Sequence, residues 1–173
     1  MYKDLLFNAQ WQEYCVTSRK TCNQKITLDT KLLRYAGCLG EEFGEVYSLL
    51  KKHWDHKHDL DMKKLEIEFG DFMWYASRLY DLRHFTLLNY GFRIQSTQIT
   101  ANYIWVRIGK FVENPNNSTF TYMMYLVINL ASQLGVDIRK VLQGNLKKLQ
   151  DPKDGRYKDG FSSTASKNRK EEK

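Results

Sequence analysis

The chain has 173 residues, of which 42% are hydrophobic and 27% are charged, a composition that is ordinary for one globular domain with its own core. No apolar run approaches the roughly 18 residues of a membrane-spanning helix, and the first residues lack the pattern of a secretory signal, so we expect neither a membrane protein nor a secreted one. The three cysteines have no metal-type spacing and are expected to be reduced thiols of a cytoplasmic protein. Two prolines and ten glycines favour long helices over a β-sandwich or barrel.

The formal net charge of +7 is spread along the chain. Residues 162–173 contribute about +2, and the stretch from Arg19 to Arg34 has five cations and one acid. A basic surface suits an anionic partner, either a nucleotide or a nucleic acid, and charge alone does not choose between them. Plain solubility explains the charge equally well.

The first part of the chain has the pattern of a short helix followed by a long one. A short amphipathic helix is expected over 3–15, before a polar loop over 16–27. A cap within 27–29 begins a long helix that runs to about Lys52, where lysines suit the negative end of the helix dipole.

A second long helix is expected over about 61–82, with Asp59 or Asp61 as its cap. The pattern of residues 83–96 is ambiguous. Residues 96–113 have apolar side chains near helical spacing, although their content of Ile, Thr and Val also suits a strand.

The C-terminal part begins after a break over 114–118. A hydrophobic helix is expected over 119–134, and Gly135 ends it. Asp137 then caps an amphipathic helix over 138–150. The sum is five or six helices, so the predicted fold class is an all-α helical bundle.

Two pairs of acids lie on the two long helices, and the members of each pair are three residues apart. They are Glu42 with Glu45 and Glu68 with Asp71. On a helical wheel these acids interrupt the apolar stripe that should face the core, whereas the neighbouring Glu41 and Glu66 fall on the solvated face. A buried carboxylate without a partner loses hydration, so it pairs, takes up a proton or binds a metal.

If the two long helices pack antiparallel, four carboxylates converge, and either buried Lys or Arg partners or divalent cations must offset their repulsion. Ligands that are all oxygen suit Mg²⁺ or Mn²⁺. The pattern alone leaves a metal site and a solvated face both open. Gly44 and Gly70 stand just before the second acid of each pair, where glycine costs a helix ~1 kcal/mol relative to alanine. Close helix approach or backbone access to a ligand would explain them.

Four segments of the chain carry a resemblance to a known family. They read GCLGEEFGEVYSLLKK, LEIEFGDFMWYAS, LASQLGVDIRKVLQGNLKKL and GRYKDGF, in this order. Together they resemble the MazG-like all-α nucleoside triphosphate pyrophosphohydrolases, in which a spacer separates an ExxE motif from an ExxD motif. Residues 46–67 form the spacer here, and the resemblance covers roughly 30–79 and 129–161.

The resemblance implies an activity, a cofactor and an oligomeric state. A nucleoside triphosphate and water would give a nucleoside monophosphate and pyrophosphate, with Mg²⁺ required and Mn²⁺ as the other candidate ion, in a homodimer or homotetramer. The implied metal ligands are Glu42, Glu45, Glu68 and Asp71. The implied substrate-binding residues are Lys51, Lys52, Tyr75, Asn145, Lys148, Arg156 and Tyr157. One carboxylate must also accept a proton from the attacking water, and we name Glu45 for this catalytic role.

Two features depart from the family pattern. Residues 80–128 are an insertion at a place where compact members are nearly continuous, and we expect an added helix or lid there. Lys158 replaces a proline of the last segment, a change that concerns the C-terminal arm and not the metal site. The expected organisation is therefore one domain over 1–161, followed by a flexible basic tail over 162–173.

Other sites remain alternatives at this point. Trp11, Trp54 and Tyr75 are candidates for stacking on the nucleotide base, although core packing explains each of them. A cluster of histidines invites a zinc site, but its spacing is irregular and no fourth ligand is evident. These are His53, His56 and His58. A P-loop is absent, and no cysteine has the neighbours of a covalent nucleophile.

Two rival functions also stay open. The first is a helical module without turnover that senses a nucleotide or pairs with another protein. The second is a basic nucleic-acid binder, which would lose affinity steeply with salt. No nucleic-acid motif supports the second, so a nucleic-acid partner is not expected.

Overall fold

The computed structural model describes residues 5–22, 27–85, 96–151, 157 and 161–162. Within these residues the structure is all-helical and has no strand, so the predicted all-α fold class is confirmed. The elements are α1 (Leu5–Ser18), the short 3-10 helix η1 (Arg19–Thr21), α2 (Leu28–His56), α3 (Met62–Arg83), α4 (Thr97–Glu113), α5 (Asn117–Gln133) and α6 (Ile138–Gln150). None of the described helices combines the length and the apolar character that crossing a membrane requires.

Two of the predicted helix ends are too early. Helix α2 continues one turn beyond Lys52, because the chain leaves the helix only at Lys57, which adopts a left-handed conformation with φ 59°. The amide of His58 then donates to the carbonyl of Lys52 at 3.3 Å and closes the last turn. Helix α1 likewise runs to Ser18 and passes into η1, where the sequence pattern predicts a polar loop.

Residues 96–113, for which the pattern allows a helix or a strand, form a helix. Ser96 begins α4, since its side chain accepts a hydrogen bond from the amide of Ile99. The buried apolar face of α4 includes Ile104, Ile108 and Phe111. Residues 86–95 lie outside the described residues, so the ambiguity over 83–96 is resolved only at its ends: α3 ends at Arg83, His84 follows in a left-handed conformation, and Ser96 caps α4.

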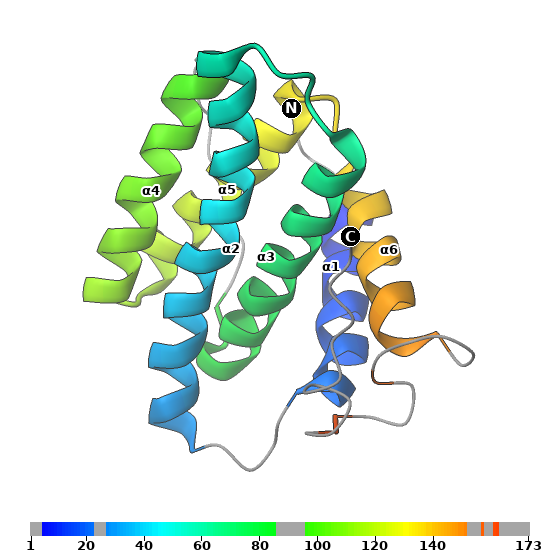
Figure 1. Ribbon diagram of the computed structural model, residues 1–173. Helices are drawn as coiled ribbons and strands as arrows, with labels where there is room; N and C mark the ends of the chain where they lie inside the picture. Colours follow the sequence, from blue (N-terminus) through cyan, green and yellow to red (C-terminus); the bar gives the residue numbers. More distant parts are fainter. Residues whose placement is uncertain (1–4, 23–26, 86–95, 152–156, 158–160, 163–173) are drawn as a thin grey trace.

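Helices α2 and α3 form an antiparallel pair at the centre of the molecule (Figure 1). Helix α4 packs on α2 and is joined to α5, whereas α1 and α6 pack together on α3. Asp61 begins α3 by accepting a hydrogen bond from the amide of Lys64, and Asp137 caps α6 in the same way. The antiparallel order brings the middle of α2 opposite the first half of α3, and this is where the four acids lie.

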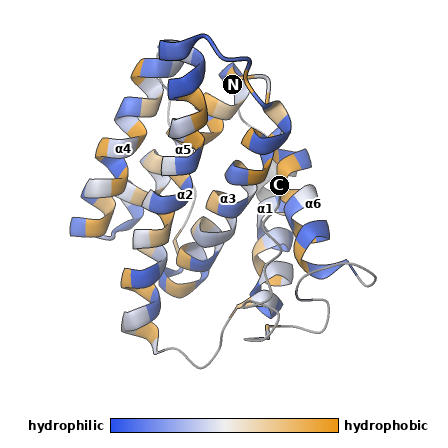
Figure 2. Cartoon of the chain, viewed as in Figure 1, coloured by the Kyte–Doolittle hydropathy of each residue, from blue (hydrophilic) through white to orange (hydrophobic). Residues whose placement is uncertain are grey.

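The core is one cluster of apolar and aromatic side chains that all the α-helices share. Phe43 of α2 lies edge-on against Phe72 of α3 and Trp105 of α4, with ring centroids 6.3 and 5.4 Å away. The connection between α2 and α3 is hydrophilic and lies at one end of the molecule (Figure 2). Packing on both sides therefore holds α2 and α3 in place, and not the connection between them.

A buried arginine attaches α1 to α3. Arg78 of α3 is 2% exposed and donates to the carbonyl of Cys15 and to the hydroxyl of Ser18, both on α1. Its charge is paired with Asp81 at 3.0 Å, so the group is satisfied in the way that a buried cation requires. This attachment determines where the α1 side chains meet the interior of the bundle.

Candidate metal centre

Three of the four acids bring carboxylate oxygens together. One oxygen each of Glu42, Glu68 and Asp71 lies within 4.8 Å of the other two, across the interface of α2 and α3. Glu68 is buried at 7% exposure, and Glu42 and Asp71 are half-buried. In the described part of the chain, this is the one group of three or more His, Cys, Asp or Glu side chains placed so that they could share a metal ion.

Glu45 lies at the solvent side of this cluster. The expectation that all four acids interrupt the buried stripe is wrong for Glu45, whose residue is exposed, because the buried stripe of α2 runs through Phe43, Val46 and Leu50 instead. The Glu45 side chain is nevertheless hydrogen-bonded to that of Glu68. It therefore adjoins the cluster without belonging to the three oxygens that lie closest together.

Burial, together with the closeness of the acids, raises the pKa values of two of them. Burial, followed by the charges of Asp71 and Glu45, raises the pKa of Glu42 to about 8. Burial and the adjacent Glu45 raise the pKa of Glu68 to about 7. Three full charges at this spacing would repel by about 10 kcal/mol at an effective dielectric constant of ~20, which is comparable with the whole stability of a domain. Protons therefore neutralise part of the cluster when no cation does.

Asp71 has two polar partners, both from α6. The Asn145 amide nitrogen donates to one carboxylate oxygen at 3.0 Å, and the Lys148 ammonium donates to the other at 2.7 Å. The sequence left two means of relieving the repulsion, a basic partner or a divalent cation. The structure supplies a basic partner in Lys148, which is paired with Asp71. Among the described residues, no lysine or arginine forms an ion pair within 4.0 Å of Glu42, Glu45 or Glu68.

The two glycines beside the acids differ in their surroundings. A Cβ at Gly70 would lie 3.1 Å from the Asn145 amide nitrogen and 3.2 Å from its Cβ, so glycine is what lets α6 approach α3 here. A Cβ at Gly44 would meet only the Trp105 ring at 3.7 Å, an ordinary contact. Close helix approach, the first of the two predicted reasons, therefore holds for Gly70 and not for Gly44, for which backbone access to a ligand stays a prediction.

The remaining substrate-binding candidates lie in different places. Lys51 and Lys52 are exposed on the last turns of α2. Tyr75 is half-buried on α3, 5.8 Å from the Tyr35 ring, and its hydroxyl is hydrogen-bonded to the Cys38 thiol. It therefore packs against α2 one turn beyond Asp71.

The C-terminal arm returns to the bundle at two described residues. The Tyr157 amide donates to the Leu149 carbonyl, and the Tyr157 side chain is buried at 9% exposure. The Phe161 amide donates to the carbonyl of Lys20, beside α1. Arg156, another predicted phosphate contact, lies outside the described residues, as does the tail from 163 onward.

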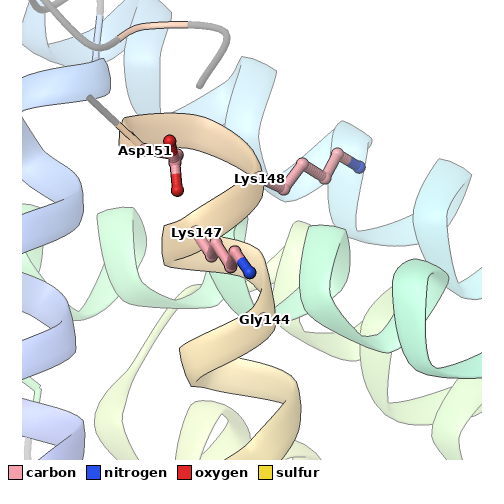
Figure 3. Close-up of a pocket in the computed structure, with 4 residues that line it drawn as sticks. All are labelled: Gly144, Lys147, Lys148 and Asp151. Carbon is pink, nitrogen blue, oxygen red and sulfur yellow. The ribbon is translucent and has the colours of Figure 1, made fainter. Parts of the chain in front are cut away.

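Cations gather where α6 ends. A shallow hollow there is lined by Gly144, Lys147, Lys148 and Asp151 (Figure 3). Figure 3 shows the Lys148 side chain extending away from Asp151, and its ammonium reaches Asp71 instead. Lys148 thus stands beside the acidic cluster, and an ammonium group in that place suits a polyanionic ligand that carries a divalent cation.

The other aromatic and histidine candidates have structural surroundings. Trp11 is buried at 1% exposure and lies edge-on against Tyr80, which favours core packing over base stacking. Trp54 is half-buried against Tyr47. The Nδ1–H of His53 donates to the His58 carbonyl at 2.9 Å, and the exposed histidines form no metal-type group within the described residues.

Sequence reasoning missed one residue of this neighbourhood. The Tyr14 hydroxyl of α1 donates to the side-chain amide oxygen (Oδ1) of Asn145 at 2.7 Å, and the Asn145 side-chain nitrogen in turn donates to Asp71. The two residues are 131 positions apart, and no motif marks Tyr14, so no local signal could have found it.

Comparisons of the chain with protein-family models, with curated proteins and with solved structures found no match. The fold and the site define the chain as an all-α helical bundle with a carboxylate cluster between its two central helices. Carboxylate oxygens at this spacing, with Lys and Asn donors beside them, suit a hard divalent cation together with an anionic ligand.

Proposed function

We propose that the protein is a Mg²⁺-dependent nucleoside triphosphate pyrophosphohydrolase, with Mn²⁺ as the other candidate ion. The observation that carries this proposal is the convergence of the Glu42, Glu68 and Asp71 oxygens within 4.8 Å, with Glu45 hydrogen-bonded to Glu68 at the solvent side. The resemblance of four ordered segments to the MazG-like family supports the choice of reaction. The cluster supplies only oxygen donors, and this donor set fits Mg²⁺ or Mn²⁺ and not zinc or copper.

The ion, when bound, would supply charge neutralisation and a more acidic water molecule. The chain's own residues would then bind the ion and accept the proton. Glu42, Glu68 and Asp71 hold the ion. Glu45 is exposed and adjoins the cluster, so it is placed to accept a proton from a water molecule that enters from solvent.

The bond changes of the proposed reaction balance without any further reactant. The water oxygen bonds to the α-phosphorus, the bond from that phosphorus to the bridging oxygen breaks, and pyrophosphate leaves. The proton lost by the water passes to Glu45. Lys148, only 17% exposed in its side chain and paired with Asp71, lies where it would bind the phosphates that depart, and the exposed Lys147 is its neighbour on α6.

A nucleotide panel tests this function. Ribo- and deoxyribonucleoside triphosphates are incubated with Mg²⁺ or Mn²⁺, and pyrophosphate and orthophosphate are measured separately. We expect pyrophosphate and the monophosphate in equal amounts. Orthophosphate as the main product would overturn the proposal, and tight nucleotide binding without turnover would favour the helical module that senses nucleotide.

A homodimer or homotetramer belongs to the same proposal. Helix α4, which lies within the proposed insertion 80–128, has several exposed apolar side chains on its outer side, and such side chains favour association. They are Ile99, Tyr103, Trp105, Val106 and Val112. Light scattering coupled to size-exclusion chromatography measures the mass, and a mass of one chain at micromolar concentration would contradict this part of the proposal.

A further inference from the structure

A chain of hydrogen bonds links helix α1 to the acidic cluster. The Tyr14 hydroxyl donates to the side-chain oxygen (Oδ1) of Asn145 at 2.7 Å, and the side-chain nitrogen (Nδ2) of Asn145 donates to Asp71 at 3.0 Å. Both Tyr14 and Asn145 are buried, at 1% and 4% exposure. These bonds are therefore made away from water, where an unsatisfied group would be costly and the geometry is held firmly.

The direction of these bonds follows from the chemistry of the groups. A primary amide has one oxygen that accepts and one nitrogen that donates, and its two ends have nearly the same shape. A carboxylate such as Asp71 needs the nitrogen end. The Tyr14 hydroxyl donates to the oxygen end, and so it selects the rotamer in which the nitrogen faces Asp71.

The Tyr14 hydroxyl is suited to be a permanent donor. Burial raises its pKa well above the ordinary value, so the phenol keeps its proton across the range in which a protein works. Its ring is stacked on Trp11 with centroids 5.9 Å apart, and Arg78 attaches its helix to α3. The close approach that Gly70 permits keeps Asn145 within reach from the other side.

We propose that Tyr14 is a positioning residue of the metal centre: it orients the Asn145 amide, which in turn holds the Asp71 carboxylate in the geometry that binds the divalent cation. This inference rests on the proposed function, since it takes Asp71 to be a metal ligand. Groups that orient ligands in this way typically change metal affinity 10–100-fold when they are removed. No contact between Tyr14 and substrate is required.

Mn²⁺ binding to the nucleotide-free protein, measured as the loss of the free-ion signal in electron paramagnetic resonance, tests the proposal. We expect Tyr14→Phe, which removes the hydroxyl and keeps the ring, to weaken Mn²⁺ binding about tenfold. Tyr80→Phe is the matched control, because Tyr80 lies edge-on against the same Trp11 and its hydroxyl bonds the Gln12 side chain instead. Tyr80→Phe should bind Mn²⁺ as the wild type does.

A double-mutant cycle distinguishes positioning from general loosening of the core. If Tyr14 acts through Asn145, the hydroxyl no longer matters once the amide is gone, so Tyr14→Phe should leave Mn²⁺ affinity unchanged in an Asn145→Leu background. The unfolding midpoint of the metal-free variants confirms that each is folded.

Each outcome bears on one proposal or the other. If Tyr14→Phe binds Mn²⁺ as tightly as the wild type does, the positioning role alone is overturned. The same holds if Tyr14→Phe weakens Mn²⁺ binding as much in the Asn145→Leu background as in the wild type. It also holds if Tyr80→Phe weakens Mn²⁺ binding as much as Tyr14→Phe does. A wild-type chain that binds no Mn²⁺ overturns the proposed function, and the positioning role with it.

Discussion

At the scale of single residues, the acidic cluster reduces its negative charge by two different means. Lys148 neutralises Asp71 by a direct ion pair, whereas Glu42 and Glu68 hold protons more tightly than an ordinary glutamate does. Both means are reversible. Under the proposed function, a divalent cation would replace the protons and compete with the ammonium.

The first prediction concerns the acids that are proposed to act in the reaction. Glu45→Gln and Asp71→Asn should each lower the rate of pyrophosphate release at least a hundredfold, a barrier increase of roughly 3 kcal/mol, because each removes a carboxylate from the site. Glu66→Gln is the matched control, since Glu66 is an exposed acid on the same helix as Asp71. Near-normal turnover in both site variants would refute these roles.

The second prediction concerns Lys148. Lys148→Met should strengthen Mn²⁺ binding to the nucleotide-free protein several-fold, because the ammonium 2.7 Å from Asp71 competes with the ion for that carboxylate. The same variant should raise KM for the nucleoside triphosphate, because a phosphate partner is lost. Lys140→Met, an exposed lysine of the same helix, should change neither quantity. Weaker Mn²⁺ binding in Lys148→Met would contradict the competition.

At the scale of helices, the sequence predicts most of the helices well, but it predicts poorly which side chains of one helix contact the next. Helix α6 has the predicted bounds, because a cap at Asp137 and a strong amphipathic pattern are local signals. The end of α2 was missed because a left-handed Lys57, rather than a glycine, closes it. The sequence places Glu45 inward because the apolar stripe of α2 can be drawn along two neighbouring lines, and the packing of α2 against both α3 and α4 decides between them.

The polar partners of the site depend on contacts that no local pattern encodes. Asp71 meets Lys148 and Asn145 from 77 and 74 positions away, and Tyr14 meets Asn145 from 131. Asn145 and Lys148 could be predicted only through the family resemblance, and Tyr14 had no such signal. The acids were therefore predictable as a group, and the residues that orient them were not.

The third prediction compares alanine substitutions at the two glycines: Gly70, at the interface of α3 and α6, and Gly44, on α2. Gly44→Ala should be neutral or stabilise the protein by up to ~1 kcal/mol, since alanine favours the helix and the new Cβ meets Trp105 at an ordinary 3.7 Å. Gly70→Ala gains the same propensity but forces Asn145 to move, so its unfolding free energy should fall below that of Gly44→Ala. Urea denaturation measures both.

Metal binding should separate these glycine variants further. Gly70→Ala displaces the amide that bonds Asp71, so Mn²⁺ affinity should fall, while Gly44→Ala should keep it. Equal stability and equal Mn²⁺ affinity of the two variants would show that the close approach of α6 to α3 has no role in the site.

At the scale of the whole molecule, the charge of the site is opposite to that of the chain. The formal net charge is +7, yet the interface of α2 and α3 holds the carboxylates of Glu42, Glu68 and Asp71, with Glu45 at its solvent side. A basic protein attracts a polyanion over a distance of about a Debye length, ≈ 8 Å at physiological salt, whereas the local acids attract the cation that such a polyanion carries. If the proposed function holds, this combination would favour a metal–nucleotide complex over either component alone.

The last prediction follows from the two raised pKa values, about 8 for Glu42 and about 7 for Glu68, against 4.5 in the unfolded chain. Between about pH 4.5 and pH 8, the folded protein therefore binds more protons at these two groups than the unfolded chain does. The stability that the two groups contribute is therefore fully present below about pH 4.5 and is lost as the pH rises through 7 and 8. We expect the Tm of the metal-free protein to fall between pH 6 and pH 8.5.

Mg²⁺ should reverse this fall. At pH 6 the ion must displace protons from Glu42 and Glu68, whereas at pH 8.5 both are ionised and repel each other, so millimolar Mg²⁺ should raise Tm more at pH 8.5 than at pH 6. Glu42→Gln should flatten the pH dependence of the metal-free protein, because the amide cannot ionise. An equal Tm increment at both pH values, or a metal-free Tm that rises over this range, would mean that the enclosed carboxylates are not what links protons, metal and stability in this fold.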